Sequence, residues 1–248
     1  MIRNMSQRDI SIVIPVYNEE DNIKPLISEL QEVLRGLGRS YEIIFVDDGS
    51  RDRSLEILKE AALQDPQIRV IRFGKNAGQT AAFDAGFRAA QGDIVVTLDA
   101  DLQNDPHDIP RLLKKIEKFD VVCGWRHKRR DPWIKIVSSK IANVVRNKLS
   151  QEEIVDTGCS LKAFRKECLQ NMKLFNGMHR FLPTLAKMEG FTATQVKVNH
   201  RPRKFGTTKY TISNRMVRAF TDLLAVRWMK NRHLNYEIEE VIGERRRD

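Results

Sequence analysis

Short apolar runs alternate with helical segments through the first hundred residues, and this alternation restricts the fold more than any other feature. The runs are rich in β-branched residues and predict buried strands at 10–16, 41–46, 69–73 and 93–98. Between them the sequence predicts helices over about 21–37, 52–63 and 79–90. Strands separated by helices in this way indicate β-α-β units, and therefore an α/β fold with a mostly parallel sheet flanked by helices.

The second half of the chain is less regular and strongly basic. A helix at 106–118 and a strand at 120–123 extend the first pattern. Residues 124–150 then hold eight Lys or Arg and one acid, and residues 197–232 hold ten and one. The net charge of +10 is therefore concentrated in two stretches. Such basic stretches favour phosphorylated ligands, anionic lipid surfaces or nucleic acids, without choosing among them.

Cysteine usage and hydropathy indicate where the protein works. Its three cysteines show no C-x-x-C spacing, which argues against a zinc site or a disulfide framework and favours the reducing cytoplasm. Residues 1–9 are polar, and no run approaches the ~20 apolar residues that cross a bilayer. The sequence predicts a cytoplasmic protein that is peripheral on the cytosolic face of a membrane and has no transmembrane segment.

Acidic side chains follow two of the predicted strands. Asp48 comes after the second strand, and Asp99 and Asp101 come directly after the fourth. Parallel sheets bind ligands at the carboxyl ends of their strands, so these acids are expected to lie at a ligand site. Two carboxylates at i and i+2 can both reach one Mg²⁺ or Mn²⁺. The alternative is a solvated loop that contains two acids.

The turn that contains Asp48 also allows two interpretations. The Asp48 carboxylate can accept a hydrogen bond from a base N–H or a ribose hydroxyl, and the segment can also be a simple turn in which Ser50 caps the next helix. The two interpretations are compatible, because one residue can cap while another binds. The turn after the first strand, 15–20, contains no glycine, and neither G-x-G-x-x-G nor G-x-x-x-x-G-K-[ST] is present. Dinucleotide-dependent dehydrogenases and P-loop proteins are therefore disfavoured, and a nucleotide held through a metal ion fits better.

Several motifs occur together in a fixed order and resemble those of one protein family. They are Val13–Glu20, Asp47–Ser50, Asn76–Gly78, Asp99–Gln103, Gly124–Arg126, Ser139–Asn143, Asp156–Cys159 and Arg203–Tyr210. The chain resembles the family 2 glycosyltransferases of the GT-A fold, and is similar within them to dolichyl-phosphate mannose synthase and the bacterial polyprenyl-phosphate hexosyltransferases. The resemblance covers about residues 10–212. Two departures are Ser160-Leu161-Lys162, where relatives commonly read Gly-Phe-Arg, and Thr208, where serine is usual.

The resemblance implies a role for each matching residue. The residues it assigns to the sugar-nucleotide donor are Pro15, Tyr17, Glu19, Asp48, Ala100 and Lys209. The residues that would hold Mg²⁺ or Mn²⁺ on the diphosphate are Asp99, Asp101 and Gln103. Those that would meet the acceptor phosphate are Arg126, Lys135 and Ser139. The catalytic group would be Asp99, Asp101, Arg126 and Arg203.

The implied reaction is an inverting transfer of a hexose from a GDP- or UDP-sugar to a polyprenyl phosphate, dolichyl or undecaprenyl. A phosphomonoester is mostly a dianion at neutral pH, so it needs cations more than a general base. The alternative is a family 2 enzyme that acts on a saccharide hydroxyl or another lipid or glycan acceptor, and that reaction needs a carboxylate base such as Asp156. A basic nucleic-acid-binding protein is a remote alternative, because no known reader motif is present.

The end of the chain is expected to differ from the rest. We assign residues 1–212 to the GT-A domain and 213–248 to a basic C-terminal extension, an amphipathic helix with a polar tail. One face of this helix holds Met216, Phe220, Leu223 and Leu224. The pattern is typical of a helix at a membrane surface and equally of one packed on the sheet. A membrane partner protein or a second copy of the chain is left open.

Overall fold

The computed structural model describes residues 8–126, 154–202, 212–234, 236 and 239–240, with the side chains of 212–220 left out. Within these residues the strands form one sheet: β1 (Ile10–Val16), β2 (Tyr41–Asp47), β3 (Ile68–Arg72), β4 (Ile94–Thr97), β5 (Val121–Arg126), β6 (Lys162–Arg165) and β7 (Ala193–Val198). The seven strands run in the order β3-β2-β1-β4-β6-β5-β7. β6 is antiparallel to its neighbours β4 and β5, and the other pairs are parallel. The predicted mostly parallel α/β sheet is confirmed.

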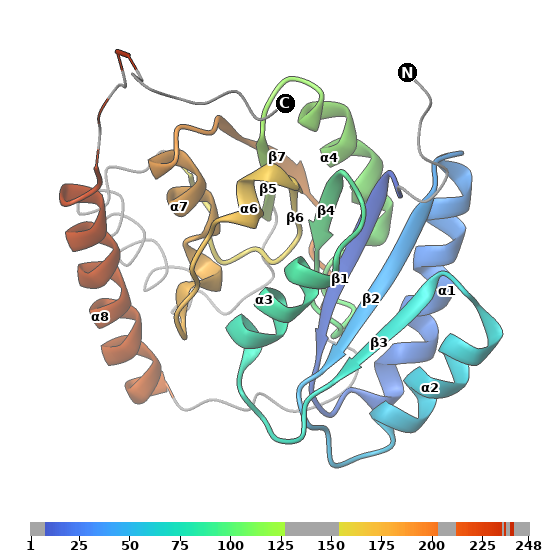
Figure 1. Cartoon of the computed structure of the whole chain (residues 1–248). Coiled ribbons are helices and arrows are strands. Elements are labelled where there is room, and N and C mark those ends of the chain that lie inside the picture. The colour runs from blue at the N-terminus through green and yellow to red at the C-terminus, as the bar shows by residue number, and fades with distance from the viewer. Residues whose placement is uncertain (1–7, 127–153, 203–211, 235, 237–238, 241–248) are drawn as a thin grey trace, which may run out of the picture.

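Helices cover both faces of the sheet (Figure 1). Those on one face are α1 (Glu20–Gly36), α2 (Ser54–Gln64) and α4 (Ile109–Ile116), which follows the 3-10 turn η1 (Pro106–Asp108). Those on the other face are α3 (Gln79–Ala89), α6 (Glu167–Gln170) and α7 (Leu182–Met188), preceded by the 3-10 turn η2 (Met178–Arg180). The apolar faces of the two helix layers bury a core on each side of the sheet, and the central strands β1 and β2 are almost fully buried.

The described apolar side chains of the last helix, α8 (Ile212–Asn231), pack on η2 and α7. Its side chains Leu223 and Val226 are buried against a cluster that includes Met178, Phe181 and Leu185. The sequence left open whether this helix lies on a membrane or packs on the sheet, and the contacts of its described side chains are with η2 and α7. No described helix is long and apolar enough to cross a membrane.

A buried acid, Glu42, links three strands. Its carboxylate accepts hydrogen bonds from the Ser11 hydroxyl (2.7 Å), from Arg69 Nη1 (2.6 Å) and from the backbone N–H of Gln91 (2.6 Å). Burial alone would raise the pKa of Glu42, but these hydrogen bonds and the charge of Arg69 outweigh it, so the pKa lies below its ordinary value. The ionised carboxylate is therefore the form that the fold stabilises.

Replacing Glu42 with glutamine is expected to lower the free energy of unfolding at pH 7 by about 2 kcal/mol, since hydrogen bonds to a buried charge are lost. Because the folded pKa is lowered, the contribution of the carboxylate is present above the unfolded pKa of ~4.3 and disappears as the pH falls below it. Urea unfolding of both proteins should show a difference at pH 7 that shrinks by pH 3.5. The control Glu56→Gln, in an exposed pair with Arg53, should change stability by less than about 0.5 kcal/mol. An equal difference at both pH values would contradict this account.

Candidate active site

The turns that follow β1 and β2 are bonded to each other at the carboxyl edge of the sheet. The N–H of Asn18, a residue with φ 53°, donates to the Ser50 hydroxyl (3.0 Å), and the N–H of Glu19 donates to the Ser54 hydroxyl (2.8 Å). The prediction that Ser50 caps the next helix is wrong, because α2 begins four residues later and the Ser50 hydroxyl serves the other turn. The Glu19 carboxylate is held by Asn22 Nδ2 at 2.7 Å.

The carboxylate of Asp48 is buried and fixes the loop before α3. It accepts hydrogen bonds from Asn76 Nδ2 (2.9 Å) and from the backbone N–H groups of Ala77 (2.6 Å) and Gly78 (2.9 Å). The backbone of Gly49, at φ +71°, approaches the same loop so closely that a Cβ would lie 2.8 Å from Asn76 N. Asp48 therefore positions a neighbouring loop, a role that the sequence motif alone did not indicate.

The acidic pair lies at the end of β4, as predicted. Asp99 Oδ1 accepts a hydrogen bond from Gln79 Nε2 at the start of α3 (2.7 Å), and Asp101 Oδ1 accepts one from the backbone N–H of Gln103 (3.1 Å). Ala100, between the two acids, and Leu102, directly after them, are buried, and Leu102 adopts φ 59°. A buried leucine in the left-handed region carries backbone strain, which is typical of functional loops. The turn thus has a fixed shape with two carboxylates beside each other.

The electrostatics of this pair favour a cation. Burial and the neighbouring charge of Asp101 raise the pKa of Asp99 to about 6. A hydrogen bond with Ser160 and the charges of Lys162 and Arg126 act in the opposite direction without cancelling the rise. Two adjacent carboxylates that resist simultaneous ionisation gain from a divalent cation between them. All the donor atoms are oxygens, which Mg²⁺ and Mn²⁺ prefer.

Arg126, at the end of β5, is engaged in a bidentate ion pair. Its Nε and Nη2 donate to the two carboxylate oxygens of Asp156 at 2.7 and 2.8 Å, and its backbone N–H also donates to Asp156 at 3.3 Å. Burial would lower the pKa of Arg126, but the pair with Asp156 raises it above its ordinary value. Both oxygens of Asp156 are already bonded to the guanidinium, so this carboxylate is poorly placed to act as a base.

Residues that the sequence did not single out support the acidic turn. Asn104 is buried, and its Oδ1 accepts from the N–H of Asp99 (3.3 Å) and from the Ser160 hydroxyl (2.7 Å). Lys162 is only 3% exposed, at the carboxyl edge between β4 and β5, and its ammonium donates to the carbonyl of Cys159. The lysine, noted in the sequence only as a departure from an arginine, is therefore a buried cation beside the acidic pair.

A second group of potential metal ligands consists of Glu29, Asp105 and His107. Arg201 Nη1 contacts both carboxylate oxygens of Glu29 (3.0 and 2.7 Å), and its Nη2 donates to Asp105 at 2.7 Å. His107 Nδ1 lies 2.9 Å from Asp105, and this hydrogen bond raises the pKa of the histidine. The guanidinium already supplies the positive charge, so the group is a salt-bridge network that joins α1, η1 and the segment after β7.

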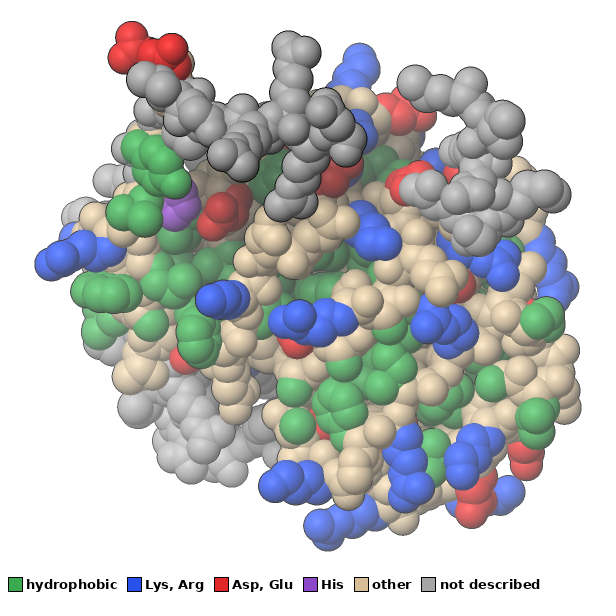
Figure 2. Space-filling view, viewed as in Figure 1, with side chains coloured by type: hydrophobic (Ala, Val, Ile, Leu, Met, Phe, Trp, Pro, Cys, Tyr) green, Lys and Arg blue, Asp and Glu red, His purple; other side chains and the backbone are tan. Residues whose placement is uncertain are grey.

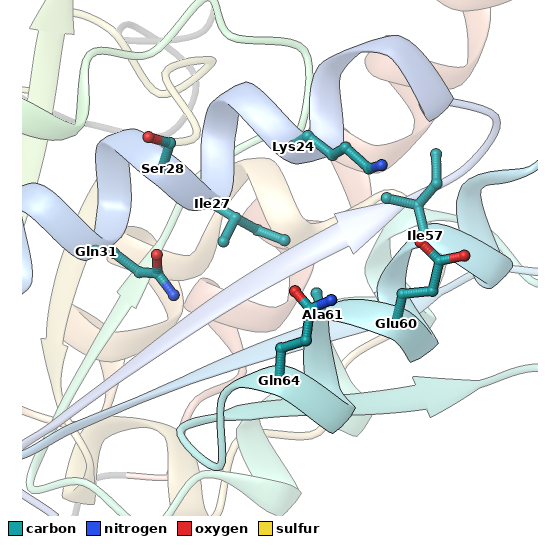
Figure 3. Close-up of a pocket in the computed structure, with 8 residues that line it drawn as sticks. All are labelled: Lys24, Ile27, Ser28, Gln31, Ile57, Glu60, Ala61 and Gln64. Atoms are coloured by element: carbon teal, nitrogen blue, oxygen red, sulfur yellow. The ribbon is translucent and has the colours of Figure 1, made fainter.

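A groove between α1 and α2 lies outside the acidic site (Figure 3). Its lining residues are Lys24, Ile27, Ser28, Gln31, Ile57, Glu60, Ala61 and Gln64. None of them belongs to the loops that follow the strands. The groove has no chemistry in common with the carboxyl edge, and we assign it no part in the site.

The structure brings part of the predicted site together. Pro15, Tyr17, Glu19 and Asp48 lie on the adjacent ends of β1 and β2 and the turns that follow them. In the turn after β4, Ala100 lies between the two acids and Gln103 follows them. Arg126 lies at the same edge of the sheet, close enough to Asp99 for the two charges to interact. The predicted residues Lys135, Ser139, Arg203 and Lys209 lie outside the described residues.

Comparison with solved structures defines the class of fold. Glucosyl-3-phosphoglycerate synthase from Mycobacterium tuberculosis, solved with Mn²⁺, UDP and phosphoglyceric acid, gives a TM-score of 0.66 at 21% identity, over 92% of this chain and 80% of that one. A mannosyltransferase from Pyrobaculum calidifontis, solved with GDP-Man and Mn²⁺, gives 0.65 at 20% identity, over 93% and 66%. These likenesses show the α/β GT-A fold.

The sequence comparison then identifies the family. The chain belongs to glycosyl transferase family 2, whose model matches residues 11–172. It is 40% identical over 220 residues to the undecaprenyl-phosphate 4-deoxy-4-formamido-L-arabinose transferase of Pectobacterium atrosepticum, covering 88% of this chain and 67% of that protein. The Proteus mirabilis protein of the same name is 38% identical over 217 residues, covering 87% and 66%. The chain thus spans about two thirds of the length of these curated relatives.

Proposed function

We propose that this family 2 glycosyltransferase moves a sugar from a nucleotide-diphospho-sugar to undecaprenyl phosphate or a closely related polyprenyl phosphate. The observation that carries the proposal is the 40% identity, over 88% of the chain, to a transferase named for undecaprenyl phosphate. The acidic pair at the end of β4 and the buried arginine at the end of β5 supply the complementary charges for a metal-bound donor and a phosphate acceptor.

Asp99, Asp101 and Gln103 are the residues that would hold Mg²⁺ or Mn²⁺. The raised pKa of Asp99 and the all-oxygen donor set fit a hard divalent cation at this turn. Two structural neighbours were themselves solved with Mn²⁺. When bound, the ion supplies Lewis-acid stabilisation of the leaving diphosphate and orients it.

The donor is proposed to lie along the carboxyl ends of β1, β2 and β4. Pro15, Tyr17 and Glu19 flank the nucleoside, and Asp48 acts on it both directly and through the loop that it fixes. Ala100 lies at the base of the donor site between the two acids. Lys209 and Arg203 are proposed to neutralise the diphosphate, with Arg203 counted among the catalytic residues.

The acceptor phosphate is proposed to meet Arg126, together with Lys135 and Ser139. A phosphate dianion attacks the anomeric carbon without a protein base, since its second pKa is about 6. The pairing of Asp156 with Arg126 supports this reaction over attack by a sugar hydroxyl, because the residue that could activate a hydroxyl is already engaged. Catalysis then rests on positioning and electrostatic stabilisation. The enzyme is proposed to work at the cytoplasmic face of the membrane, where such an acceptor is held.

The test is transfer of radiolabel from donor to lipid. The purified protein is incubated with undecaprenyl phosphate in detergent, Mg²⁺ or Mn²⁺, and UDP- and GDP-linked sugars, 4-deoxy-4-formamido-L-arabinose among them. We expect metal-dependent label in the organic phase with one of the donors. Donor hydrolysis or transfer to a saccharide, without lipid product, would overturn the acceptor assignment and leave the donor assignment standing.

A further inference from the structure

The side chains of α8 that the structure describes, at 221–231, include buried apolar residues on one side and exposed apolar residues on another. On the inner side Leu223 and Val226 are 5% and 0% exposed. They pack against η2 and α7 through Phe181 and Leu185. This contact accounts for the attachment of the helix to the domain but uses only part of its apolar surface.

The outer side of the helix leaves large apolar residues in solvent. Leu224 is 45% exposed and Trp228 is 64% exposed. They are four positions apart and therefore lie on one face, which also holds the exposed Ala225. Just beyond the helix, Leu234 and Tyr236 are 78% and 74% exposed. Figure 2 shows green apolar side chains with blue basic ones among them at the left edge, where α8 stands in Figure 1.

The exposed charged side chains in the described part of α8 are basic. Arg227 and Arg232 are exposed beside it. The acid of the helix, Asp222, is turned inward, since its carboxylate packs directly against the backbone of Gly177 beside η2. After the helix, His233 contacts Glu189 at the end of α7 (3.5 Å), and the next acid in the sequence is Glu237. The outer face therefore combines exposed aromatic and aliphatic groups with positive charge.

We infer that the outer face of α8, formed by Leu224, Ala225 and Trp228 with Arg227 and Arg232, docks on an anionic lipid surface. Tryptophan is favoured at the boundary between water and lipid because its ring is apolar and its N–H is polar. Arginines beside it are attracted to anionic headgroups. The inference rests on the proposed lipid acceptor, which brings the enzyme to a membrane.

A second copy of the chain fits this face less well. In a two-fold dimer the same surface of each copy meets the other, so Arg227 and Arg232 of the two copies would lie in one contact and repel each other. An anionic lipid surface attracts the same two arginines.

The inner contacts of α8 connect this face to the active site. Gly177, against which Asp222 packs, donates its N–H to the hydroxyl of Thr80 (3.0 Å), and that hydroxyl lies 2.7 Å from His179 Nδ1. Thr80 follows Gln79, whose amide donates to Asp99. Docking of α8 would therefore hold the acidic turn at a set position relative to the membrane, as an embedded acceptor requires.

The test is co-sedimentation of the full chain with vesicles. Vesicles of phosphatidylcholine alone are compared with vesicles that also contain phosphatidylglycerol. We expect binding to the anionic vesicles, and an apparent Kd at least about tenfold weaker for Leu224→Glu/Trp228→Glu. The control Leu63→Glu alters a residue of α2 that is 89% exposed, and it should bind like the parent. A further variant, Arg227→Gln/Arg232→Gln, should lose the preference for anionic vesicles.

Unchanged vesicle binding in Leu224→Glu/Trp228→Glu would overturn the inference, and so would a concentration-dependent dimer that this variant abolishes while vesicle binding persists. Transfer to undecaprenyl phosphate in detergent separates this result from the proposed function. We expect the outer-face variant to keep the parent rate there, because the detergent assay needs no vesicle surface. A variant that loses detergent activity as well as vesicle binding would also contradict a purely docking role.

Discussion

Asp101→Asn is expected to abolish metal-dependent sugar transfer, lowering kcat/KM by at least about 10³-fold, which corresponds to about 4 kcal/mol of transition-state stabilisation. The substitution removes one of two carboxylates proposed to hold the cation while keeping the side-chain oxygen that accepts from the N–H of Gln103. Binding of Mn²⁺ in the presence of nucleoside diphosphate, followed by calorimetry, should weaken in parallel. This second measurement reads the metal site without relying on turnover.

The same substitution is expected to stabilise the metal-free protein at pH 7.5. The folded state raises the pKa of Asp99, so above a pH of about 6 the ionised pair opposes folding, and this penalty is absent at pH values below the unfolded pKa of ~3.9. Removing the charge of Asp101 relieves part of the penalty. The melting temperature without metal should therefore rise slightly, while added Mn²⁺ should stabilise the parent more than the variant.

A matched control is Asp84→Asn, which removes a carboxylate from the exposed i,i+4 pair with Arg88 on α3. It should leave transfer, Mn²⁺ binding and melting temperature close to those of the parent. If Asp101→Asn retained more than about a tenth of the parent activity and bound Mn²⁺ normally, the acidic turn would not be the metal site.

The first half of the fold could be predicted because its signals are local. Each strand from β1 to β4 is a short apolar run between helices, and the observed bounds lie within two residues of the predicted ones. The antiparallel strand β6 escaped prediction for a physical reason. It has four residues and begins with Lys162, whose burial depends on a carbonyl and charges supplied by other segments. The strand β7, Ala-Thr-Gln-Val-Lys-Val, is too weakly apolar to be distinguished from a surface segment.

The candidate site also has a part that could be predicted from the sequence and a part that could not. The acids at strand ends could be placed from the sequence, because parallel topology determines where the carboxyl ends meet. The residues that hold them in place could not. Gln79 contacts Asp99 from twenty positions away, Ser160 reaches Asn104 across 56 positions, and Asp48 binds a loop 28 to 30 positions later. Such contacts depend on how separate loops fold back on one edge, and no spacing rule encodes them.

The pair of Arg126 and Asp156 is expected to act as one unit in acceptor binding. Arg126→Lys keeps the charge but cannot reproduce the two parallel hydrogen bonds to the carboxylate. We expect it to lower kcat/KM for the lipid acceptor by about 10²-fold, or about 2.7 kcal/mol. Asp156→Asn should give a similar loss, because the guanidinium then has no charged partner to orient it. Hydrolysis of the donor in the absence of acceptor should change little in either variant.

A double-mutant cycle separates this positioning role from base catalysis. If Asp156 acts through Arg126, the double variant should be no less active than either single variant, so the coupling energy should be close to one full single-variant loss. If Asp156 were the base for a sugar hydroxyl, Asp156→Asn would abolish transfer while Arg126→Lys retained most of it. The rate of the parent enzyme would then also fall at acid pH as Asp156 is protonated, and any residual rate of Asp156→Asn would not show this fall. Breaking a buried pair costs about 3–5 kcal/mol of stability, so the rates must be compared below the melting temperature of the least stable variant. Equal, non-additive losses would tie the acceptor phosphate to Arg126 and exclude Asp156 as the base.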